Sequence, residues 1–364
     1  MLLSARLSGA HGLVEINSRL RADPVLQRAF GRGLCAEQSV VQRTLDACTA
    51  TTVKQMEQAM DMIYRQHSQG YQPDYRTSVQ LLDVDMGGLP CGSKAAFTTK
   101  GYFAKQRNRR GRQLGRVLAS HYAEIVVDRL FDGKTQLTKA LQPLLHAAER
   151  TLQLDKAKRV RTIVRMDSGG GSLDNLNWLL SRGYQIHAKD YSSRHARSLA
   201  KSVLVWFDDP HAPERQAGWV TEAPTAYVRP VRRIAVRCQQ QDGEWAVGVL
   251  ISNVAAADVF ELTGQSPSQL ADAQAVLWAS VAFYDQRGGG IETSLKGDKQ
   301  GLGSTSRNKK RFEAQQMLML LGSLTHNTIV WARRWLAAPR SDWTQSGCAP
   351  REPVEKSCSL LELH

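Results

Sequence analysis

Hydrophobic and polar positions follow both helical and strand periods along the chain, and this mixture predicts an α/β protein. Short runs rich in aliphatic and β-branched residues, at 78–86, 157–166 and 184–191, are typical of strands, and 116–131 fits one or two more. Helical spacing predicts helices at 135–154, 172–182, 266–286 and 312–338. Between 203 and 263 the pattern is β-rich and irregular, so we expect an insertion there.

The first 75 residues are expected to form a separate helical region. Asp23-Pro24 supplies a helix N-cap followed by a first-turn proline, and three short apolar sets suggest three helices. Such helices suit either a helix-turn-helix unit that binds DNA or a plain bundle. A second domain is expected at 76–338, with its β-rich insertion at 203–263. The polar, proline- and serine-containing stretch 339–364 is expected to be disordered.

Net charge points to a polyanionic partner. Lys and Arg number 48 against 34 Asp and Glu, giving +14, and the basic residues recur along the whole chain. Nucleic acid is therefore favoured over an acidic membrane surface, with a merely basic soluble protein as the alternative. The six cysteines show no CxxC spacing that would indicate zinc. No apolar run reaches the roughly 18 residues of a membrane span, and the N-terminus lacks signal-peptide anatomy, so we expect a cytoplasmic, nucleoid-associated protein.

Aspartates mark two of the predicted strands. Asp83 and Asp85 lie two residues apart and so face the same side of their strand. Buried carboxylates need partners, so this pair indicates either a site or an edge strand with solvated aspartates. Asp167 follows the strand at 157–166 and precedes three glycines, a position typical of ligand sites in α/β sheets and also of an ordinary helix-entry turn.

A third chemical segment, residues 284–299, holds Tyr284, Arg287, Glu292 and Lys299. Glu292 and Lys299 are seven residues apart, about two helical turns, and therefore share a helix face. A carboxylate can hold a metal ion while nearby cations hold phosphate oxygens. The alternative is a solvated helix with ordinary Glu–Lys pairs.

The stretch 98–116 contains seven basic residues and no acidic ones. Either it is a solvated basic loop, or it is a hairpin that follows a phosphate backbone. The second interpretation assigns DNA contacts to Lys100, Arg107, Arg109 and Arg110.

These motifs, taken in order, resemble those of DDE-type insertion-sequence transposases. The matching residues are Asp83-x-Asp85, then Arg165-x-Asp167-Ser168-Gly169, and then Tyr284-x-x-Arg287 with Glu292 and Lys299. The resemblance implies an RNase H-like fold whose mixed sheet is flanked by helices. It implies catalysis by Asp85, Asp167 and Glu292, with Asp83 as the reserve candidate for the first position. These carboxylates would hold two Mg²⁺ or Mn²⁺ ions about 3.5–4 Å apart.

The resemblance also implies partners. Tyr284, Arg287 and Lys299 would hold DNA near the scissile phosphate, and the partners would be the element's ends, the target DNA and a second copy of the chain assembled on DNA. The segment LRADPVLQRAF resembles the region that precedes the core in this family. Because the chain begins abruptly within that resemblance, we expect an upstream portion to be missing.

One departure from the family pattern concerns the spacing before Glu292. The family has three residues between its arginine and glutamate, whereas this chain has four, at 288–291. In an α-helix the extra residue rotates Arg287 and Glu292 roughly 140° apart. Either a π-bulge absorbs it or the glycines break the helix. The predicted function is a DNA transposase, and the alternatives are a decayed DNA-binding remnant and a standalone metal-dependent nuclease.

Overall fold

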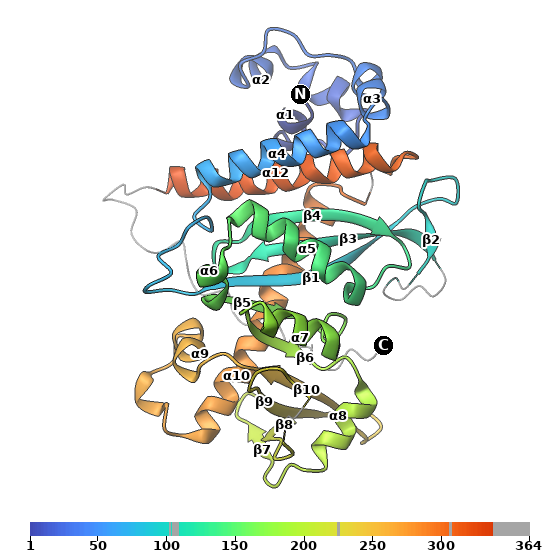
Figure 1. The fold of residues 1–364 in the computed structure, drawn as a ribbon. Coiled ribbons are helices and arrows are strands. Elements are labelled where there is room, and N and C mark those ends of the chain that lie inside the picture. The colour runs from blue at the N-terminus through green and yellow to red at the C-terminus, as the bar shows by residue number, and fades with distance from the viewer. Residues whose placement is uncertain (102, 104–108, 224–225, 306–307, 338–364) are drawn as a thin grey trace. The chain divides into compact units, whose positions relative to one another are not determined.

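The computed structural model describes residues 1–101, 103, 109–223, 226–305 and 308–337 (Figure 1). The expected tail at 339–364 and Arg107 lie outside these residues. The chain is α/β, as predicted, and it divides into two compact units that we describe separately. The first unit comprises Met1–Pro73, Val84–Leu154 and Ile291–Trp335, and the second comprises Asp74–Asp83, Asp155–Gly290 and the remainder.

The first unit opens with short helices. They are α1 (Leu2–Leu7), the π-helix η1 (Ile16–Leu20), α2 (Pro24–Ala29), α3 (Gln38–Asp46) and the long α4 (Ala50–His67). The predicted start of α2 is confirmed, because Asp23 Oδ1 accepts hydrogen bonds from the backbone N–H groups of Val25 and Leu26 at 2.9 Å. A small apolar cluster that includes Ile16 and Leu20 forms the core of this region.

The sheet of the first unit is built around one long strand. Its strands are β1 (Gln80–Pro90, of which Val84–Pro90 belongs here), β2 (Thr99–Lys100), β3 (Arg110–Ala119) and β4 (Glu124–Asp132). Their order is β2-β3-β1, and β4 also pairs with β3, antiparallel. The stretch 116–131 therefore contributes to two strands, joined by the short helix η2 (Ser120–Tyr122) and a left-handed residue, Ala123. Three further helices complete the unit, namely α5 (Leu137–Leu152), α11 (Thr293–Gly301) and α12 (Phe312–Leu336).

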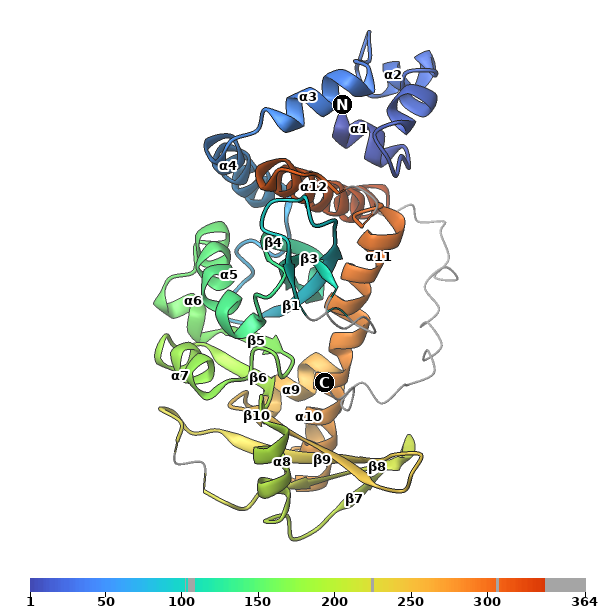
Figure 2. The same cartoon turned by 90° about the vertical axis from the view of Figure 1, so that its right-hand side faces the viewer.

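Helices α4 and α12 lie side by side in both views (Figures 1 and 2). Tyr64 and Trp331 meet edge to face with ring centroids 6.4 Å apart. Beneath them the fully buried Glu124 accepts hydrogen bonds from Gly70 N–H at 2.9 Å and from Trp331 Nε1–H at 3.0 Å. Burial alone would raise the pKa of Glu124, but hydrogen bonds, that of Ser68 first, hold the pKa below its usual value. One buried carboxylate thus ties both helices to β4.

The second unit contains a mixed sheet. Its strands are β5 (Thr162–Met166), β6 (Gln185–Lys189), β7 (Phe207–Asp209), β8 (Ala212–Trp219), β9 (Arg232–Gln239) and β10 (Trp245–Ser252), in the order β5-β6-β10-β9-β8-β7. Strands β5 and β6 are parallel, whereas β6–β10, β10–β9, β9–β8 and β8–β7 are antiparallel pairs. The helices are α6 (Lys156–Val160), α7 (Leu173–Ser181), α8 (Ser193–Ala200), α9 (Ala256–Thr263), η3 (Pro267–Gln269) and α10 (Ala273–Arg287). The predicted β-rich run at 203–263 contains β7 to β10, but its last residues, Ala256–Thr263, form α9 instead.

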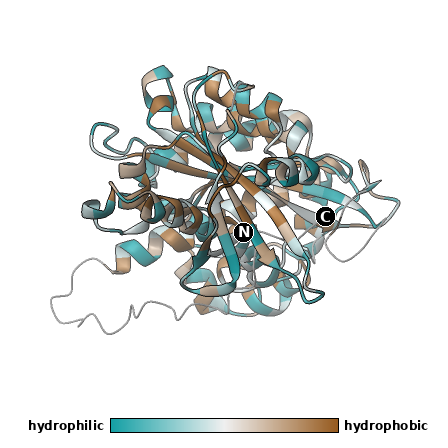
Figure 3. Ribbon diagram, turned by 90° about the horizontal axis from the view of Figure 1, so that it is seen from below, coloured by the Kyte–Doolittle hydropathy of each residue, from teal (hydrophilic) through white to brown (hydrophobic). Residues whose placement is uncertain are grey.

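Helix α10 is apolar on more than one side. Leu277 and Val281 pack with residues of β8, β9 and β10, whereas Val276 and Phe283 pack in a second cluster with Ile163 of β5. Figure 3 shows apolar residues concentrated in the strands near the centre of the view. A helix with two buried faces is fixed in rotation, so the residues at its end are held in position. In the described part of the chain, no helix is both long and apolar enough to cross a membrane.

Candidate active site

The two aspartates of β1 have different environments. Asp83 is fully buried, and Arg165 of β5 donates to both of its oxygens, from Nε to Oδ1 at 2.6 Å and from Nη2 to Oδ2 at 2.9 Å. The Arg165 guanidinium also donates to the Phe283 carbonyl oxygen and lies 4.8 Å from the Phe283 ring centroid. Asp83 therefore neutralises a buried arginine. The arginine of the Arg-x-Asp motif takes part in the core of the second unit.

Asp85 is half-buried and lies near a cation in the first unit. Its Oδ1 accepts a hydrogen bond from the Met86 N–H at 2.7 Å. Burial lowers the pKa of Lys299 on α11, while the negative charge of Asp85 opposes that shift. Glycine at position 87 makes room for this lysine, since a Cβ there would lie 3.1 Å from Lys299 Nζ. The structure thus brings Asp85 and Lys299, both predicted site residues, into one electrostatic environment.

Asp167 follows the carboxyl end of β5 and is half-buried. Its Oδ1 accepts a hydrogen bond from the Gly169 N–H at 2.9 Å, and its carbonyl oxygen accepts one from the Gly170 N–H at 3.2 Å. Gly171 then passes so close to β6 that a Cβ would lie 1.9 Å from the Lys189 carbonyl oxygen. The glycines therefore shape a tight turn that fixes Asp167 beside the end of the neighbouring parallel strand.

Lys189, at the end of β6, is the residue whose carbonyl oxygen this turn approaches, and its side chain is half-buried. Burial lowers the pKa of its ammonium group, Asp167 opposes the shift, and Arg287 adds to it. The second unit thus has its own carboxylate–lysine combination, with Arg287 close enough to act on it electrostatically. Its position on a strand alone does not reveal that Lys189 is partly buried.

The extra residue before Glu292 is absorbed by a π-helix. Helix α10 ends at Arg287, the π-helix η4 covers Gly288–Glu292, and α11 begins at Thr293. A π-turn closes over five residues, so the five-residue step from 287 to 292 corresponds to about one turn. Of the two predicted alternatives, the π-bulge is confirmed, and the glycines do not break the helix. Glu292 is exposed on the helix, between the buried Ile291 and Leu295 of its own turn.

A buried charge network that the sequence did not predict holds α11 in the first unit. Arg116 of β3 donates to both oxygens of Asp128, at 2.8 and 2.6 Å, and forms an ion pair with Asp298 of α11 at 2.7 Å. Its Nη1 donates to Ser294 Oγ at 2.7 Å. His326 of α12 completes the network through a 3.0 Å contact with Asp298. Burial opposes ionisation of Asp298, yet Arg116 and His326 keep its pKa below the usual value.

Tyr284 and Arg287, predicted to contact DNA, are both buried in this structure. Tyr284 is 4% exposed and packs with Leu277 and Val281, and Arg287 is 3% exposed with its guanidinium 6.0 Å from the Tyr284 ring centroid. Their DNA contacts stay a prediction. As placed here, both side chains belong to the interior of the second unit.

The basic stretch 98–116 divides into exposed and buried cations. Lys100, Arg109 and Arg110 are exposed on or next to the antiparallel β2–β3 pair, and their DNA contacts stay a prediction. Arg112 and Arg116, to which no DNA contact was assigned, are 1% and 2% exposed and therefore cannot meet a phosphate backbone as placed here. Arg116 neutralises buried carboxylates, and Arg112 donates to backbone carbonyl groups. Arg107 lies outside the described residues.

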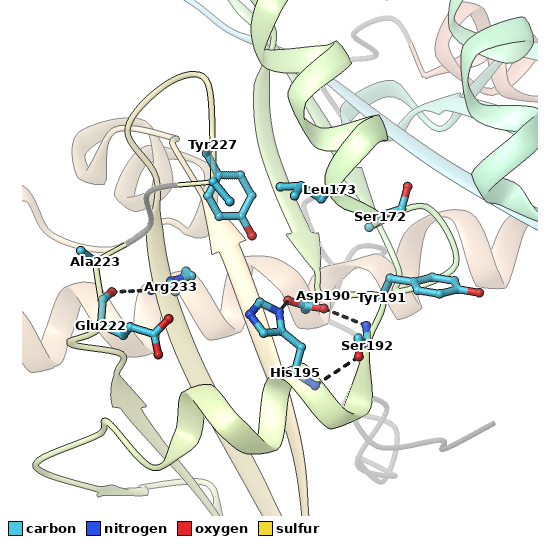
Figure 4. A pocket seen from close by; sticks show the side chains of 12 residues that line it. Ser172, Leu173, Asp190, Tyr191, Ser192, His195, Glu222, Ala223, Tyr227 and Arg233 are labelled. Carbon is cyan, nitrogen blue, oxygen red and sulfur yellow. Dashed lines mark hydrogen bonds and ion pairs between the residues drawn. The ribbon is translucent and has the colours of Figure 1, made fainter.

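A separate cavity of about 340 Å³ in the second unit is lined by the starts of α7 and α8 and by part of β9 (Figure 4). His195 Nδ1 lies 2.8 Å from Asp190 Oδ2, which orients the imidazole. Ser192 Oγ accepts from the backbone N–H of His195 at 3.1 Å, which is a helix cap and not a nucleophile–base pair. Burial, followed by the charge of Asp190, raises the pKa of Tyr227 to about 12.

The three predicted carboxylates are distributed over both units. Asp85 and Glu292 belong to the first unit and Asp167 to the second, so their convergence stays a prediction. Within residues 1–101, 103, 109–223, 226–305 and 308–337, no group of three or more His, Cys, Asp or Glu side chains is placed to hold a metal ion.

Comparisons with known proteins add little to this description. No family model matches the chain, and no curated protein sequence matches it. Among solved structures, the chain is similar to a piggyBac transposase synaptic complex with hairpin DNA, determined by cryo-electron microscopy, with 14% identity and a TM-score of 0.34. The match covers 72% of this chain and 55% of that one. A TM-score this low carries no argument about fold or activity.

Proposed function

We propose that the chain is a metal-dependent DNA transposase, a polynucleotidyl transferase that cleaves DNA and joins the cut strand to a target. The observation that carries this proposal is the position of Asp167. It follows a parallel strand, next to Lys189 of the neighbouring parallel strand, on a turn whose glycines allow close backbone approach. Such an edge of parallel strands is the usual ligand position in α/β sheets, and a carboxylate with a lysine suits a metal-bound phosphodiester.

The fold class is compatible with an RNase H-like core. In the first unit β4, β3 and β1 neighbour one another, and in the second β5 and β6 are parallel and joined through α7. Helices accompany both sheets. We propose that the antiparallel strands and the parallel pair form the core, and that β7 to β10 are its insertion.

Asp85 is the better candidate for the first catalytic position. Asp83 is fully buried and bonded through both oxygens to Arg165, so a metal ion there would have to displace a buried arginine. Asp85 is half-buried and lies near Lys299. The π-helix supports Glu292 as the third carboxylate, because it restores the one-turn relationship with Arg287 that the family pattern requires.

The donor set fits Mg²⁺ or Mn²⁺. Asp85, Asp167 and Glu292 offer only hard carboxylate oxygens, and each is half-buried or exposed, so an ion can reach it. When bound, the ions would supply activation of the attacking oxygen and stabilisation of the leaving oxygen. Lys299 and Lys189 would balance the carboxylate charge and bind phosphate oxygens, and the Arg116 network would keep α11 in place.

The alternative is a DNA-binding remnant of a transposase that no longer cuts. This alternative was suggested by the extra residue before Glu292, and the π-helix that accommodates this residue makes the alternative less favourable. A standalone metal nuclease is the third candidate. A titration of Mg²⁺ or Mn²⁺ with labelled duplex DNA carrying the element's ends separates them. Retarded migration without cleavage indicates the remnant, cleavage alone indicates the nuclease, and cleavage with joining indicates the transposase.

Asp167→Asn tests the chemistry directly. The substitution keeps size and most hydrogen bonding while it removes the negative charge. Cleavage and joining should fall by several orders of magnitude, whereas DNA affinity without metal should hold or rise because a negative charge near phosphate is lost. A mutant that still cuts near the wild-type rate would exclude Asp167 as a metal ligand.

A further inference from the structure

Two basic segments that are far apart in sequence are joined in the first unit. Arg112 of β3 donates from Nε to the Ala96 carbonyl oxygen at 2.8 Å and from Nη1 to the Lys309 carbonyl oxygen at 3.0 Å. The Ala96 N–H donates in turn to the Lys310 carbonyl oxygen at 2.8 Å. The buried arginine thus fastens the loop before β2 to the segment before α12.

Several exposed cations belong to the two joined segments and to the β2–β3 strand pair. The Lys100–Arg110 pair lies in register on β2 and β3, and the Cys91 N–H donates to the Arg110 carbonyl oxygen at 3.2 Å. The stretches 91–101 and 308–311 contain no acidic residue. The exposed side chains define what we call the basic surface: Lys94, Lys100, Arg109, Arg110 and Lys310.

An exposed aromatic ring lies in the loop before β2, which also carries Lys94. Phe97 follows Ala96, is 64% exposed, and has a φ of 57°. Positive φ is uncommon for a bulky residue and persists only where neighbouring contacts impose it. Here Arg112 and Lys310 fix the preceding residue, and Phe312 contacts the ring edge to face at 4.9 Å between centroids. The loop therefore holds a largely exposed apolar ring three residues after the exposed Lys94.

We infer that the basic surface binds the backbone of double-helical DNA, with its cations on phosphates and Phe97 in apolar contact with the sugar or base edge. The inference rests on the proposed function, and it assigns a place for the duplex. Exposed cations on two joined segments, together with an exposed apolar ring on one of them, match a phosphate backbone. A membrane-binding surface would instead need a broad apolar face, typically of an amphipathic helix.

The salt dependence of binding tests the cations. The full chain is mixed in EDTA with a fluorescent duplex of random sequence, and affinity is followed between about 50 and 200 mM salt. Lys94→Gln with Lys310→Gln removes one cation from each joined segment, and the slope of log K against log salt should flatten by about 1.8, or about 0.9 per phosphate. The control, Arg194→Gln with Arg197→Gln, removes two exposed charges from α8 and should leave the slope unchanged. Equal slopes for the two variants would overturn the inference.

A second variant tests the ring. Phe97→Asn tolerates the left-handed backbone and removes the apolar surface. Affinity should fall about tenfold at every salt concentration, with no change of slope, because no charge is lost. Leu34→Asn, which replaces an 88% exposed apolar residue elsewhere in the first unit, should bind like wild type. Wild-type affinity of the Phe97 variant would remove Phe97 from the interface.

The failures of this inference and of the proposed function are distinguishable. If the Lys94 and Lys310 substitutions flatten the salt dependence but the wild type never cleaves DNA, the basic surface is supported and the proposed transposase activity is refuted. If the wild type cleaves and joins DNA but these substitutions do not change its binding, the proposed activity is supported and the basic surface is refuted. Anionic vesicles that bind as tightly as the duplex, with the same response to the variants, would overturn the choice of DNA.

Discussion

Acidification should destabilise the second unit through one buried histidine. His187 of β6 is fully buried, with its ring 4.9 Å from that of Phe283 and 6.1 Å from that of Tyr284. Burial, assisted by the nearby charges of Arg165 and Arg232, lowers the pKa of His187 from 6.5 to about 3. The folded chain therefore keeps this imidazole neutral at a pH where the unfolded chain protonates it.

The sign and size of the effect follow from that difference. Below about pH 6.5 the unfolded state binds a proton that the folded state does not, so the free energy of unfolding falls as the pH falls. The loss is about 1.4 kcal/mol for each pH unit until the folded pKa is reached. Between about pH 7 and pH 5 it amounts to about 2 kcal/mol. Natural domains typically have an unfolding free energy of about 5–15 kcal/mol, so a loss of about 2 kcal/mol is a large fraction of the total.

Urea unfolding of wild type and of His187→Leu at both pH values measures this contribution. The leucine fills a similar volume and cannot titrate. Tryptophan fluorescence reports the transition, and the difference between the two proteins at each pH cancels the titration of groups they share. The wild type should lose about 2 kcal/mol more than the variant on acidification.

The outcome that refutes the reasoning is a parallel loss of stability in both proteins. It would mean that His187 is protonated in the folded state or is exposed to water there. The offset between the proteins at pH 7 reports the packing change, and the pH argument depends only on how that offset changes between pH 7 and pH 5.

Three further outcomes are expected. Asp83→Asn should lower the free energy of urea unfolding by about 3–5 kcal/mol because it breaks a buried ion pair. Asp85→Asn should change that free energy by less than about 1 kcal/mol while it abolishes cleavage. The reverse pattern would exchange the roles of the two aspartates. Gly171→Ala should lower the unfolding free energy by about 3 kcal/mol or more, since its Cβ would meet a backbone oxygen at 1.9 Å, and a wild-type melting curve would contradict this. Deleting Gly289 should convert the π-helix to an α-helix and keep cleavage within about tenfold of wild type; a loss of several orders of magnitude would show that the π-turn itself is required.

Local patterns predicted much of the fold. The end of β5, the turn after it and the start of α7 follow from an aliphatic run, an aspartate and glycines, all of which act over a few residues. The same is true of α2, whose Asp23-Pro24 start is confirmed by its hydrogen bonds. For the site, the spacing before Glu292 restricted the backbone to two alternatives, and the π-helix is one of them.

Pairings between distant residues could not be predicted in this way. A charge count gives Arg112 and Arg116 the same expected exposure as Arg109 and Arg110, because it contains no information on which arginine meets a partner in the fold. Likewise Asp83 and Asp85 are equivalent by strand alternation. Arg165, on another strand, is what distinguishes them.

The π-helix at Gly288–Glu292 has a consequence for the way such proteins are found. A search pattern that requires three residues between the arginine and the glutamate rejects this sequence outright. Yet one inserted residue costs the helix only a local widening, after which α11 continues with α-helical geometry. The spacing of a helical motif is therefore better counted in turns than in residues. Patterns that accept either four or five steps where glycines occur would recover chains that have taken up such an insertion.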